Sequence, residues 1–317
     1  MSSSRIAPFV LEPKFTPRPW GARHLAPLFD YAVSSDAEPI GEVWLTGEQC
    51  RARTGKSAGK QLRELCDQFG PDLVGTASLS TNRFPLLLKF LFTQERLSVQ
   101  VHPDDRTAQS TGEPCGKEEC WYIVDAQAHT KIALGLRPGV QKPQFQKAIE
   151  QNRAEELLNW LDVHAGEMIY VAAGTVHTIG PGAIIFEVQQ NSDMTYRLYD
   201  YGRPRELHLQ KGLDALKEET GAGKVKTAAL EDGAERLIAT DHFVIDRYLL
   251  DGARTFRPKT GHSPQCLIAL QGSSTIIGAG FEPLSFTRSE AAIIPACINE
   301  FVLEPSAPMQ VLVCALP

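Results

Sequence analysis

The sequence lacks the cysteine patterns that would indicate disulfides or a cysteine-bound zinc ion. Seven cysteines are scattered along 317 residues, their number is odd, and no two of them form a C-x-x-C pair. Disulfide frameworks and cysteine zinc sites both depend on paired cysteines at short or regular spacing. We therefore expect reduced thiols and a cytoplasmic protein.

Two further absences narrow the class of protein. The sequence has no apolar run of membrane-spanning length, and its first residues, MSSSRIAPFVLEPKF, lack the sustained apolar stretch of a signal peptide. The formal net charge is −6 and the pI is about 5.8, so there is no basic excess of the kind that attracts nucleic acid or anionic membranes. We expect neither as a partner, whereas a small anionic ligand is compatible because a pocket can carry its own local charge.

Most of the chain alternates between short strand-like stretches and turn residues. Runs of apolar residues are bounded by Gly, Pro, Asn and Asp, which is typical of antiparallel strands. Two stretches have helical periodicity: residues 57–70, with Ser57 as the expected N-cap, and residues 142–161, with Pro143 in the first turn. The sequence therefore predicts a mainly β fold with a few short helices. The predicted strands are Phe84–Phe92, Cys120–Asp125, Met168–Ala172, Ala183–Gln189, Thr195–Tyr199, His242–Leu250, Cys266–Leu270, Ser274–Ile277, Ala291–Ile294 and Gln310–Cys314.

The two halves of the chain are weakly alike. AGEMIYVAAGTVHTI in the first can be laid against RSEAAIIPACINEFVL in the second, which places His177 opposite Glu300. If both halves are jelly-roll barrels, only the first retains the imidazole. We predict an N-terminal catalytic barrel with helical insertions over residues 1–203, a helical connection over 204–235, and a degenerate β domain over 236–317.

The stretch LSVQVHPDD, residues 97–105, contains the first candidate site residues. Side chains alternate in a strand, so the apolar residues share one face while Ser98, Gln100 and His102 share the other. Pro103 cannot donate to a strand ladder and ends the strand. This polar face fits either solvent exposure or a site, and residues elsewhere in the chain must decide.

Two other segments offer metal ligands. GKEECWY places Lys117 and Glu119 on one strand face and Glu118 on the other, and AAGTVHTI presents His177 after a small-residue turn. Two imidazoles, a carboxylate and an amide suit zinc with an open position, and manganese, iron(II) or cobalt also fit. If one ion is shared, the nearest ring nitrogens of His102 and His177 lie within about 6 Å of each other.

Three more charged residues stand in apolar strands. Glu187 and Arg197 lie in IIFEVQQNSDMTYRLYDYGR, where NSD predicts a hairpin turn between the two strands, and Lys89 lies in FPLLLKFLF. A glutamate and an arginine that face one cavity can form a buried ion pair. Beside a metal they can instead transfer a proton and bind an anion.

These motifs together resemble the type I mannose-6-phosphate isomerases, in their short bacterial form. The resemblance rests on FPLLLKFLFTQERLSVQVHPDD, GKEECWY and VAAGTVHTIGPGAIIFEVQQNSDMTYRLYDYGR, with PKFTPRPWG and PIGEVWLTGE near the N-terminus. It is dense from Pro13 to about Arg203 and sparse afterwards. It implies a cupin fold and a zinc-dependent aldose–ketose isomerase with one zinc ion per subunit, which interconverts mannose 6-phosphate and fructose 6-phosphate through an enediol.

The resemblance also assigns roles to individual residues. The implied metal ligands are Gln100, His102, Glu119 and His177. The expected catalytic residues are Arg197, Glu187 and Lys117, and the expected substrate-binding residues are Ser98, Lys89, Lys117 and Arg197. We expect Lys89, Ser98 and Lys117 to bind the phosphate, because its oxygens accept several hydrogen bonds.

Two other functions are alternatives to this one. Another metal-dependent cupin enzyme would use the same ligands, although the basic residues argue against an oxygenase. A non-catalytic sugar-phosphate-binding cupin would keep the pocket but has no need for an open metal position. The sequence leaves open whether the protein is a monomer or a homodimer, and which sugar phosphates it accepts.

Overall fold

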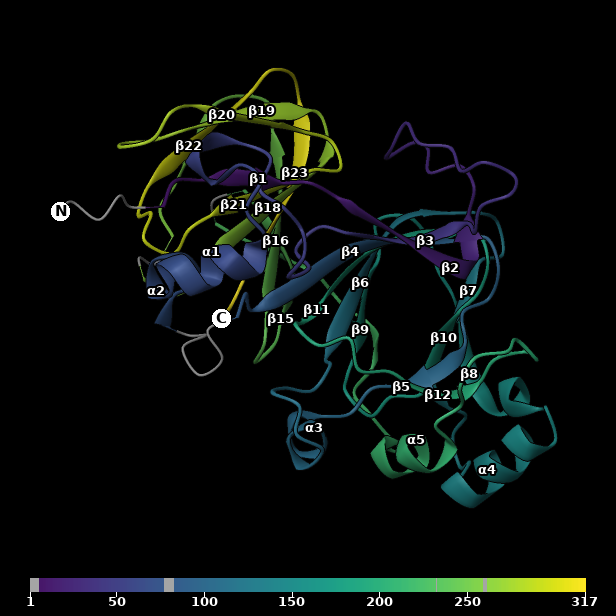
Figure 1. The fold of residues 1–317 in the computed structure, drawn as a ribbon. Coiled ribbons are helices and arrows are strands. Elements are labelled where there is room, and N and C mark those ends of the chain that lie inside the picture. Colours follow the sequence, from purple (N-terminus) through teal and green to yellow (C-terminus); the bar gives the residue numbers. More distant parts are fainter. Residues whose placement is uncertain (1–5, 77–82, 232, 259–260) are drawn as a thin grey trace.

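The computed structural model describes residues 6–76, 83–231, 233–258 and 261–317. Its strands form four sheets in two halves, with short helices at the periphery (Figure 1). The predicted mainly β fold with a few short helices is confirmed. The division into residues 1–203, 204–235 and 236–317 stays a prediction.

The first half holds two sheets that enclose one core. Trp121 and Ile185 of the larger sheet share this core with Leu134 and Ile179 of the smaller sheet. The larger sheet runs, in spatial order, through β13 (Gly223–Lys224), β9 (Met168–Val171), β6 (Glu119–Ala126), β11 (Ala183–Gln190), β4 (Leu86–Thr93), β3 (Ile40–Trp44) and β2 (Lys14–Ala22). The smaller sheet runs through β12 (Tyr196–Tyr199), β5 (Val99–Val101), β10 (His177–Ile179), β7 (Lys131–Leu136) and β8 (Leu158–Asp162).

The second half repeats this arrangement with a seven-stranded and a four-stranded sheet. The larger sheet runs through β1 (Phe9–Leu11), β21 (Ala291–Ile294), β18 (Gln265–Gln271), β23 (Met309–Ala315), β16 (Val244–Leu250), β15 (Glu235–Ala239) and β14 (Ala228–Ala229). The smaller sheet runs through β17 (Arg254–Phe256), β22 (Phe301–Pro305), β19 (Ser273–Ile277) and β20 (Leu284–Thr287). The edge strand of the larger sheet, β1, comes from the N-terminal part of the chain, far in sequence from the other strands of that sheet.

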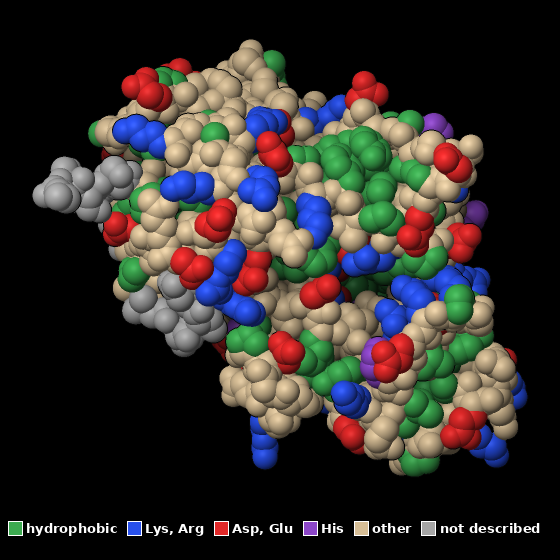
Figure 2. Space-filling view, in the orientation of Figure 1, with side chains coloured by type: hydrophobic (Ala, Val, Ile, Leu, Met, Phe, Trp, Pro, Cys, Tyr) green, Lys and Arg blue, Asp and Glu red, His purple; other side chains and the backbone are tan. Residues whose placement is uncertain are grey.

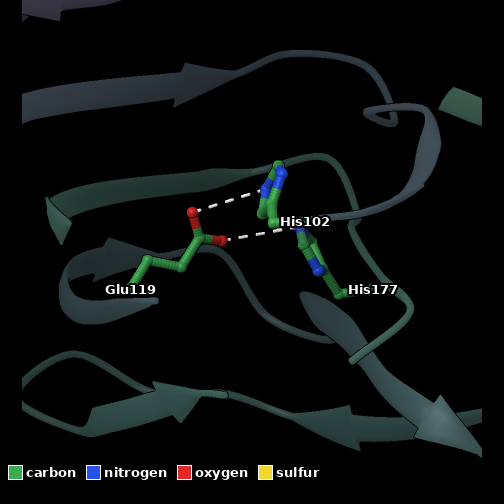
Figure 3. Close-up of side chains that lie close together, drawn as sticks. All are labelled: His102, Glu119 and His177. Atoms are coloured by element: carbon green, nitrogen blue, oxygen red, sulfur yellow. Dashed lines mark ion pairs between the residues drawn. The ribbon is translucent and has the colours of Figure 1, made fainter. Parts of the chain in front are cut away.

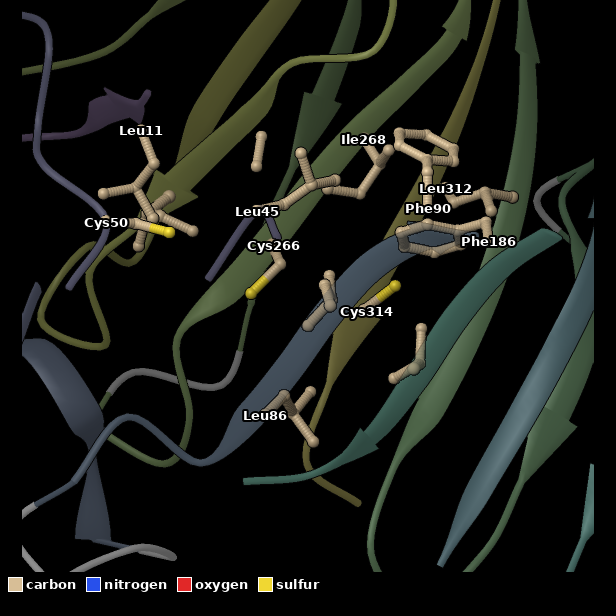
Figure 4. Close-up of a cluster of buried hydrophobic side chains, with 14 of the residues drawn as sticks. Leu11, Leu45, Cys50, Leu86, Phe90, Phe186, Cys266, Ile268, Leu312 and Cys314 are labelled. Atoms are coloured by element: carbon tan, nitrogen blue, oxygen red, sulfur yellow. The ribbon is translucent and has the colours of Figure 1, made fainter. Parts of the chain in front are cut away.

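The two halves are joined by a common hydrophobic core. Phe90 on β4 and Phe186 on β11 belong to the same buried cluster as Cys266 on β18 and Leu312 and Cys314 on β23 (Figure 4). The two seven-stranded sheets thus pack against each other, and the first half's own core remains on the opposite face of its large sheet.

The helices are shorter than the sequence predicts. The first predicted helix is α1 (Leu62–Phe69), and its N-cap is Gln61 rather than Ser57, because Gln61 and Glu64 exchange the two bonds of a capping box. The second, α4 (Lys142–Glu150), ends before Asn152, whose φ of 58° is left-handed. The prediction of helix to residue 161 was wrong, because residues from Leu158 onward pair with β7 as strand β8. The other helical segments are η1 (Gly55–Ser57), α2 (Pro71–Val74), α3 (Asp105–Ser110), η3 (Ala154–Leu157) and α5 (Leu209–Ala215).

The predicted hairpin around NSD was also wrong. Strand β11 lies between β4 and β6 in the seven-stranded sheet, whereas β12 pairs with β5 in the five-stranded sheet. The turn therefore crosses from one sheet to the other, and Glu187 and Arg197 come from different sheets instead of adjacent strands.

Among the described residues, none of the helices has both the length and the apolar character that a membrane crossing requires.

Candidate metal and substrate site

Strand pairing in the five-stranded sheet places three predicted site residues side by side. Gln100 on β5 is opposite His177 on β10 and, on its other side, opposite Arg197 on β12. Paired residues project from the same face of a sheet. His102 follows Gln100 by two residues and therefore lies on the same face.

The seven-stranded sheet contributes a second row. Trp44, Lys89, Glu187 and Trp121 are successive cross-strand neighbours on β3, β4, β11 and β6. Glu119 precedes Trp121 by two residues and shares its face. Glu119, the predicted ligand, therefore lies on the strand face that points into the interior shared by the two sheets, whereas Glu118 lies on the other face.

His102, Glu119 and His177 converge on one point. Their ligand atoms all lie within 4.8 Å of one another, inside the limit of about 6 Å for two imidazoles on one ion. The two carboxylate oxygens of Glu119 each face one ring: Oε2 lies 3.5 Å from Nε2 of His102, and Oε1 lies 3.4 Å from Nε2 of His177 (Figure 3). All three side chains are buried.

Backbone carbonyls fix the tautomer of both imidazoles. His102 donates from Nδ1 to the carbonyl of Met194 at 2.9 Å, and His177 donates from Nδ1 to the carbonyl of Thr175 at 3.0 Å. This leaves both Nε2 lone pairs directed at the cluster. Burial lowers the pKa of His177 to about 4, and burial followed by the nearby Lys117 ammonium lowers the pKa of His102 well below its ordinary value. Both rings are therefore neutral at pH 7, which is the form that binds a metal.

Gln100 and Lys117 lie next to these ligand atoms. The Gln100 amide donates from Nε2 to Nε2 of His177 at 3.1 Å, while its oxygen accepts from Ser98. A half-turn of the amide would direct its oxygen to the cluster. Lys117 donates from Nζ to Nε2 of His102 at 3.0 Å and lies 3.1 Å from Oε2 of Glu119.

The donor set fits a divalent cation. Both oxygens of Glu119 are buried and have no hydrogen bond; Oε2 has an ion pair with Lys117, whereas Oε1 faces the neutral ring of His177. A buried carboxylate is costly unless cations or donors satisfy it. Two neutral imidazole nitrogens and one such carboxylate are ligands that zinc accepts, with room for further ligands.

Glu187 is paired with a lysine rather than with Arg197. Its Oε1 lies 3.1 Å from Nζ of Lys89, and its Oε2 accepts a hydrogen bond from the Trp121 indole at 3.1 Å. Burial raises the pKa of Glu187, although the Lys89 charge opposes this. Burial acts to lower the pKa of Lys89, but the carboxylates of Glu187 and then Glu42 outweigh it and the pKa is raised. Lys89 therefore stays charged.

A cavity of about 430 Å³ lies beside the cluster. Both Gln100 and Lys117, which contact the ligand imidazoles, line it, and so do the other predicted substrate and proton-transfer residues Ser98, Lys89, Glu187 and Arg197. Figure 2 shows Lys and Arg side chains gathered around a hollow between the upper and lower parts of the molecule. The remaining lining is formed by Pro17, Arg18, Pro19, Trp20, Glu38, Glu42, Leu91, Leu97, Asp193, Thr195, Arg205 and His208.

One ion pair in this lining was not predicted. Arg18 donates to both carboxylate oxygens of Glu42, at 3.1 and 2.9 Å, and Trp44 donates to Glu42 at 2.7 Å. Burial acts to raise the pKa of Glu42, but Lys89 and Arg18 outweigh it and lower the pKa to about 2. The flanking motifs PRPWG and GEVWL carried the resemblance, but nothing in their spacing indicated that these two side chains meet.

Comparisons with known proteins agree with one another. Residues 9–138 match the family model of phosphomannose isomerase type I, catalytic domain. Mannose-6-phosphate isomerase ManA of Bacillus subtilis is 34% identical over 94% of this chain and 96% of its own length. Mannose-6-phosphate isomerase of Streptococcus mutans is 30% identical over 93% of this chain and 94% of its own length.

Solved structures lead to the same family, and they confirm the predicted cupin fold. The crystal structure of mannose 6-phosphate isomerase from Bacillus subtilis superposes with a TM-score of 0.85 at 28% identity, and covers 98% of this chain and 99% of that chain. A zinc-bound mannose 6-phosphate isomerase shares the fold, with a TM-score of 0.77 at 16% identity over 97% of this chain and 99% of that chain.

Proposed function

Because this chain belongs to the mannose-6-phosphate isomerase family, we propose that the cavity beside the His102–Glu119–His177 cluster is its active site. The chain is an aldose–ketose isomerase that interconverts mannose 6-phosphate and fructose 6-phosphate, with zinc as its cofactor. One observation supports this site above all: Lys117 and Gln100 line the cavity and each contacts a ligand imidazole. A sugar in the cavity would therefore lie next to the ligand cluster.

The proposed zinc ligands are His102, Glu119 and His177, with Gln100 assisting through its amide oxygen. When bound, zinc supplies a positive charge that polarises the sugar carbonyl and stabilises the charge developing on its oxygen. The two backbone carbonyls that hold the imidazole Nδ1 atoms orient the rings before any metal arrives.

The proposed catalytic residues are Glu187, Arg197 and Lys117. Isomerisation moves a proton between C1 and C2 through an enediol, and the group that carries it needs a pKa near the working pH. Burial shifts the pKa of Glu187 in that direction. Arg197 offers a guanidinium to the developing charge, and its Nε is buried without a hydrogen-bond partner. Lys117 holds its ammonium between the cavity and the ligand cluster.

We propose that Ser98, Lys89, Lys117 and Arg197 bind the substrate. All four line the cavity, and together they present hydroxyl, ammonium and guanidinium donors to an anionic sugar. The non-catalytic sugar-phosphate-binding alternative is not favoured, since this chain matches isomerases over nearly its whole length.

We propose the division of the chain into residues 1–203 as the catalytic unit, 204–235 as the connection and 236–317 as the degenerate barrel. All three clustered ligands lie in the first of these. We also propose that the enzyme works in the cytoplasm, and the seven cysteines, none of which is disulfide-bonded in the described residues, support this.

A turnover assay before and after chelation tests the function. Fructose 6-phosphate formed from mannose 6-phosphate is measured in a coupled assay, and bound metal is measured on the same sample. We expect about one zinc ion per chain, loss of turnover on chelation and its recovery when zinc is restored. Full turnover by metal-free protein would remove the zinc-dependent mechanism, and no turnover by zinc-loaded protein would remove the isomerase function.

A further inference from the structure

Three arginines surround a single buried carboxylate at one corner of the cavity. Asp200 has a side chain only 1% exposed and accepts from Arg205 at both oxygens, Nε to Oδ2 at 2.6 Å and Nη2 to Oδ1 at 2.7 Å. Arg203 lies 3.4 Å from Oδ1, and Nε of Arg197 lies 4.0 Å from Oδ2. The other acidic side chain of residues 197–208, Glu206, is 83% exposed. The corner therefore holds an excess of positive charge, on arginine side chains that are 16–22% exposed.

The other lysine and arginine side chains that line the cavity are already paired. Among the described residues that line it, Lys89 is paired with Glu187, Lys117 with Glu119, and Arg18 with Glu42, all within 3.1 Å. A phosphate dianion adds two negative charges and gains most where cations are not already neutralised. Within the described lining, the corner beside Asp200 meets this condition.

Arg205 is the arginine of this corner that is both fixed and turned to the cavity. It lines the cavity, whereas Arg203 does not; Arg203 instead donates to the carbonyl of Arg96 and lies over the Tyr201 ring. Asp200 engages the Nε and Nη2 side of the Arg205 guanidinium, which leaves the Nη1 donors directed away from Asp200. A planar guanidinium held in this way is positioned to donate two hydrogen bonds to an oxyanion.

We propose that Arg205 binds the phosphate of the substrate and that Asp200 is a positioning residue that holds Arg205 for this task. This inference rests on the proposed function, because it names the group that recognises the substrate's phosphate in the same cavity. Arg197 reaches this corner from beside Gln100, so a sugar whose phosphate is anchored at Arg205 would extend past Arg197 and bring its carbonyl end to the ligand cluster.

The test compares three variants of the full, zinc-loaded chain. Arg205→Gln removes the proposed phosphate donor, and Asp200→Asn weakens the ion pair that holds Arg205 in place. Arg203→Gln is the matched control, since it also removes an arginine charge beside Asp200 but from a side chain that does not line the cavity. We expect Arg205→Gln to raise KM for mannose 6-phosphate about 10- to 100-fold, with kcat within about threefold of wild type. Asp200→Asn should raise KM in the same direction, and Arg203→Gln should change it less than about threefold.

Inorganic phosphate serves as the probe for the corner itself. Its inhibition constant should rise in Arg205→Gln and Asp200→Asn in parallel with KM, with zinc content and circular dichroism unchanged. An unchanged KM or an unchanged phosphate inhibition constant in a folded Arg205→Gln enzyme would overturn the proposal, as would equal effects in Arg203→Gln. If wild type shows no turnover, the proposed function fails, and calorimetric titration of inorganic phosphate into wild type and Arg205→Gln still decides whether the corner binds phosphate.

Discussion

Replacing Lys89 by methionine should destabilise the protein in a strongly pH-dependent way. The side chains of Lys89 and Glu187 are 3% and 5% exposed, and their charged atoms lie 3.1 Å apart. Methionine fills a similar volume but cannot pair with Glu187, which then keeps the hydrogen bond from the Trp121 indole. Removal of one member of a buried ion pair costs about 3–5 kcal/mol, because the other charge stays buried. We expect a loss of that size in the free energy of unfolding near pH 8.

The sign of the pH dependence follows from the pKa of Glu187. Burial already raises this pKa in the wild type, and the Lys89 charge opposes the shift. Without Lys89 the pKa rises further above its unfolded value, so the folded state retains the proton over a wider pH range. Folded protein then binds more protons than unfolded protein, and stability falls as pH rises. The cost of Lys89→Met should therefore be smaller at about pH 5.5 than at about pH 8.5.

A double-mutant cycle measured by urea unfolding in the presence of zinc provides the decisive assay. Lys89→Met combined with Glu187→Gln replaces both charges, so its cost should fall at least about 2 kcal/mol short of the sum of the single costs. Lys131→Met is the control, because its pair with Asp162 at 3.6 Å is half exposed and should contribute under about 1 kcal/mol. Additive single costs, or a cost of Lys89→Met that grows toward acid pH, would refute the reasoning.

Three further changes test other parts of the structure. His177→Ala should leave a folded protein without bound zinc or turnover, and zinc retained at wild-type level would contradict its role as a ligand. Glu42→Gln removes a carboxyl whose pKa is about 2, so the wild type's advantage of about 3 kcal/mol should be present above pH 4.5 and disappear as pH falls toward 2; identical acid-unfolding curves would disprove this. Gly174→Ala should cost about 1–2 kcal/mol of stability, because Gly174 has a φ of +90° and a Cβ there would lie 2.8 Å from the Lys217 side chain. It should also weaken zinc binding, because the Gly174 N–H donates to the His102 carbonyl. An unchanged melting temperature and an unchanged zinc affinity would contradict this prediction.

Strand alternation was the most informative property of the sequence. Because side chains alternate along a strand, LSVQVH indicated that Gln100 and His102 share a face, and GKEECWY indicated the same for Lys117 and Glu119. Within one strand this needs no knowledge of the partner strand. Local patterns also located the predicted strands, and helical periodicity located α1 and α4, although both are shorter than predicted.

What the sequence could not provide is which strands become neighbours. The apolar run LLNWL fits helix or strand equally well by periodicity, and pairing with β7 decided for a strand. NSD has the composition of a hairpin turn, but the chain crosses between sheets there. The corner of Asp200 and Arg205 was missed for a related reason, since a turn segment has no periodicity that says where its side chains point.

Strand β1 pairs with β21 at the edge of the second half's larger sheet. A sheet built mainly from residues after 228 is therefore completed by residues 9–11, which are synthesised long before them. A fragment that begins after residue 203 would expose the β21 edge as a template for strands from other molecules. During synthesis, Phe9–Leu11 must likewise wait for residues 291–294 to leave the ribosome before they find their partner. The second half can therefore be completed only after the segment that contains β21 has been made.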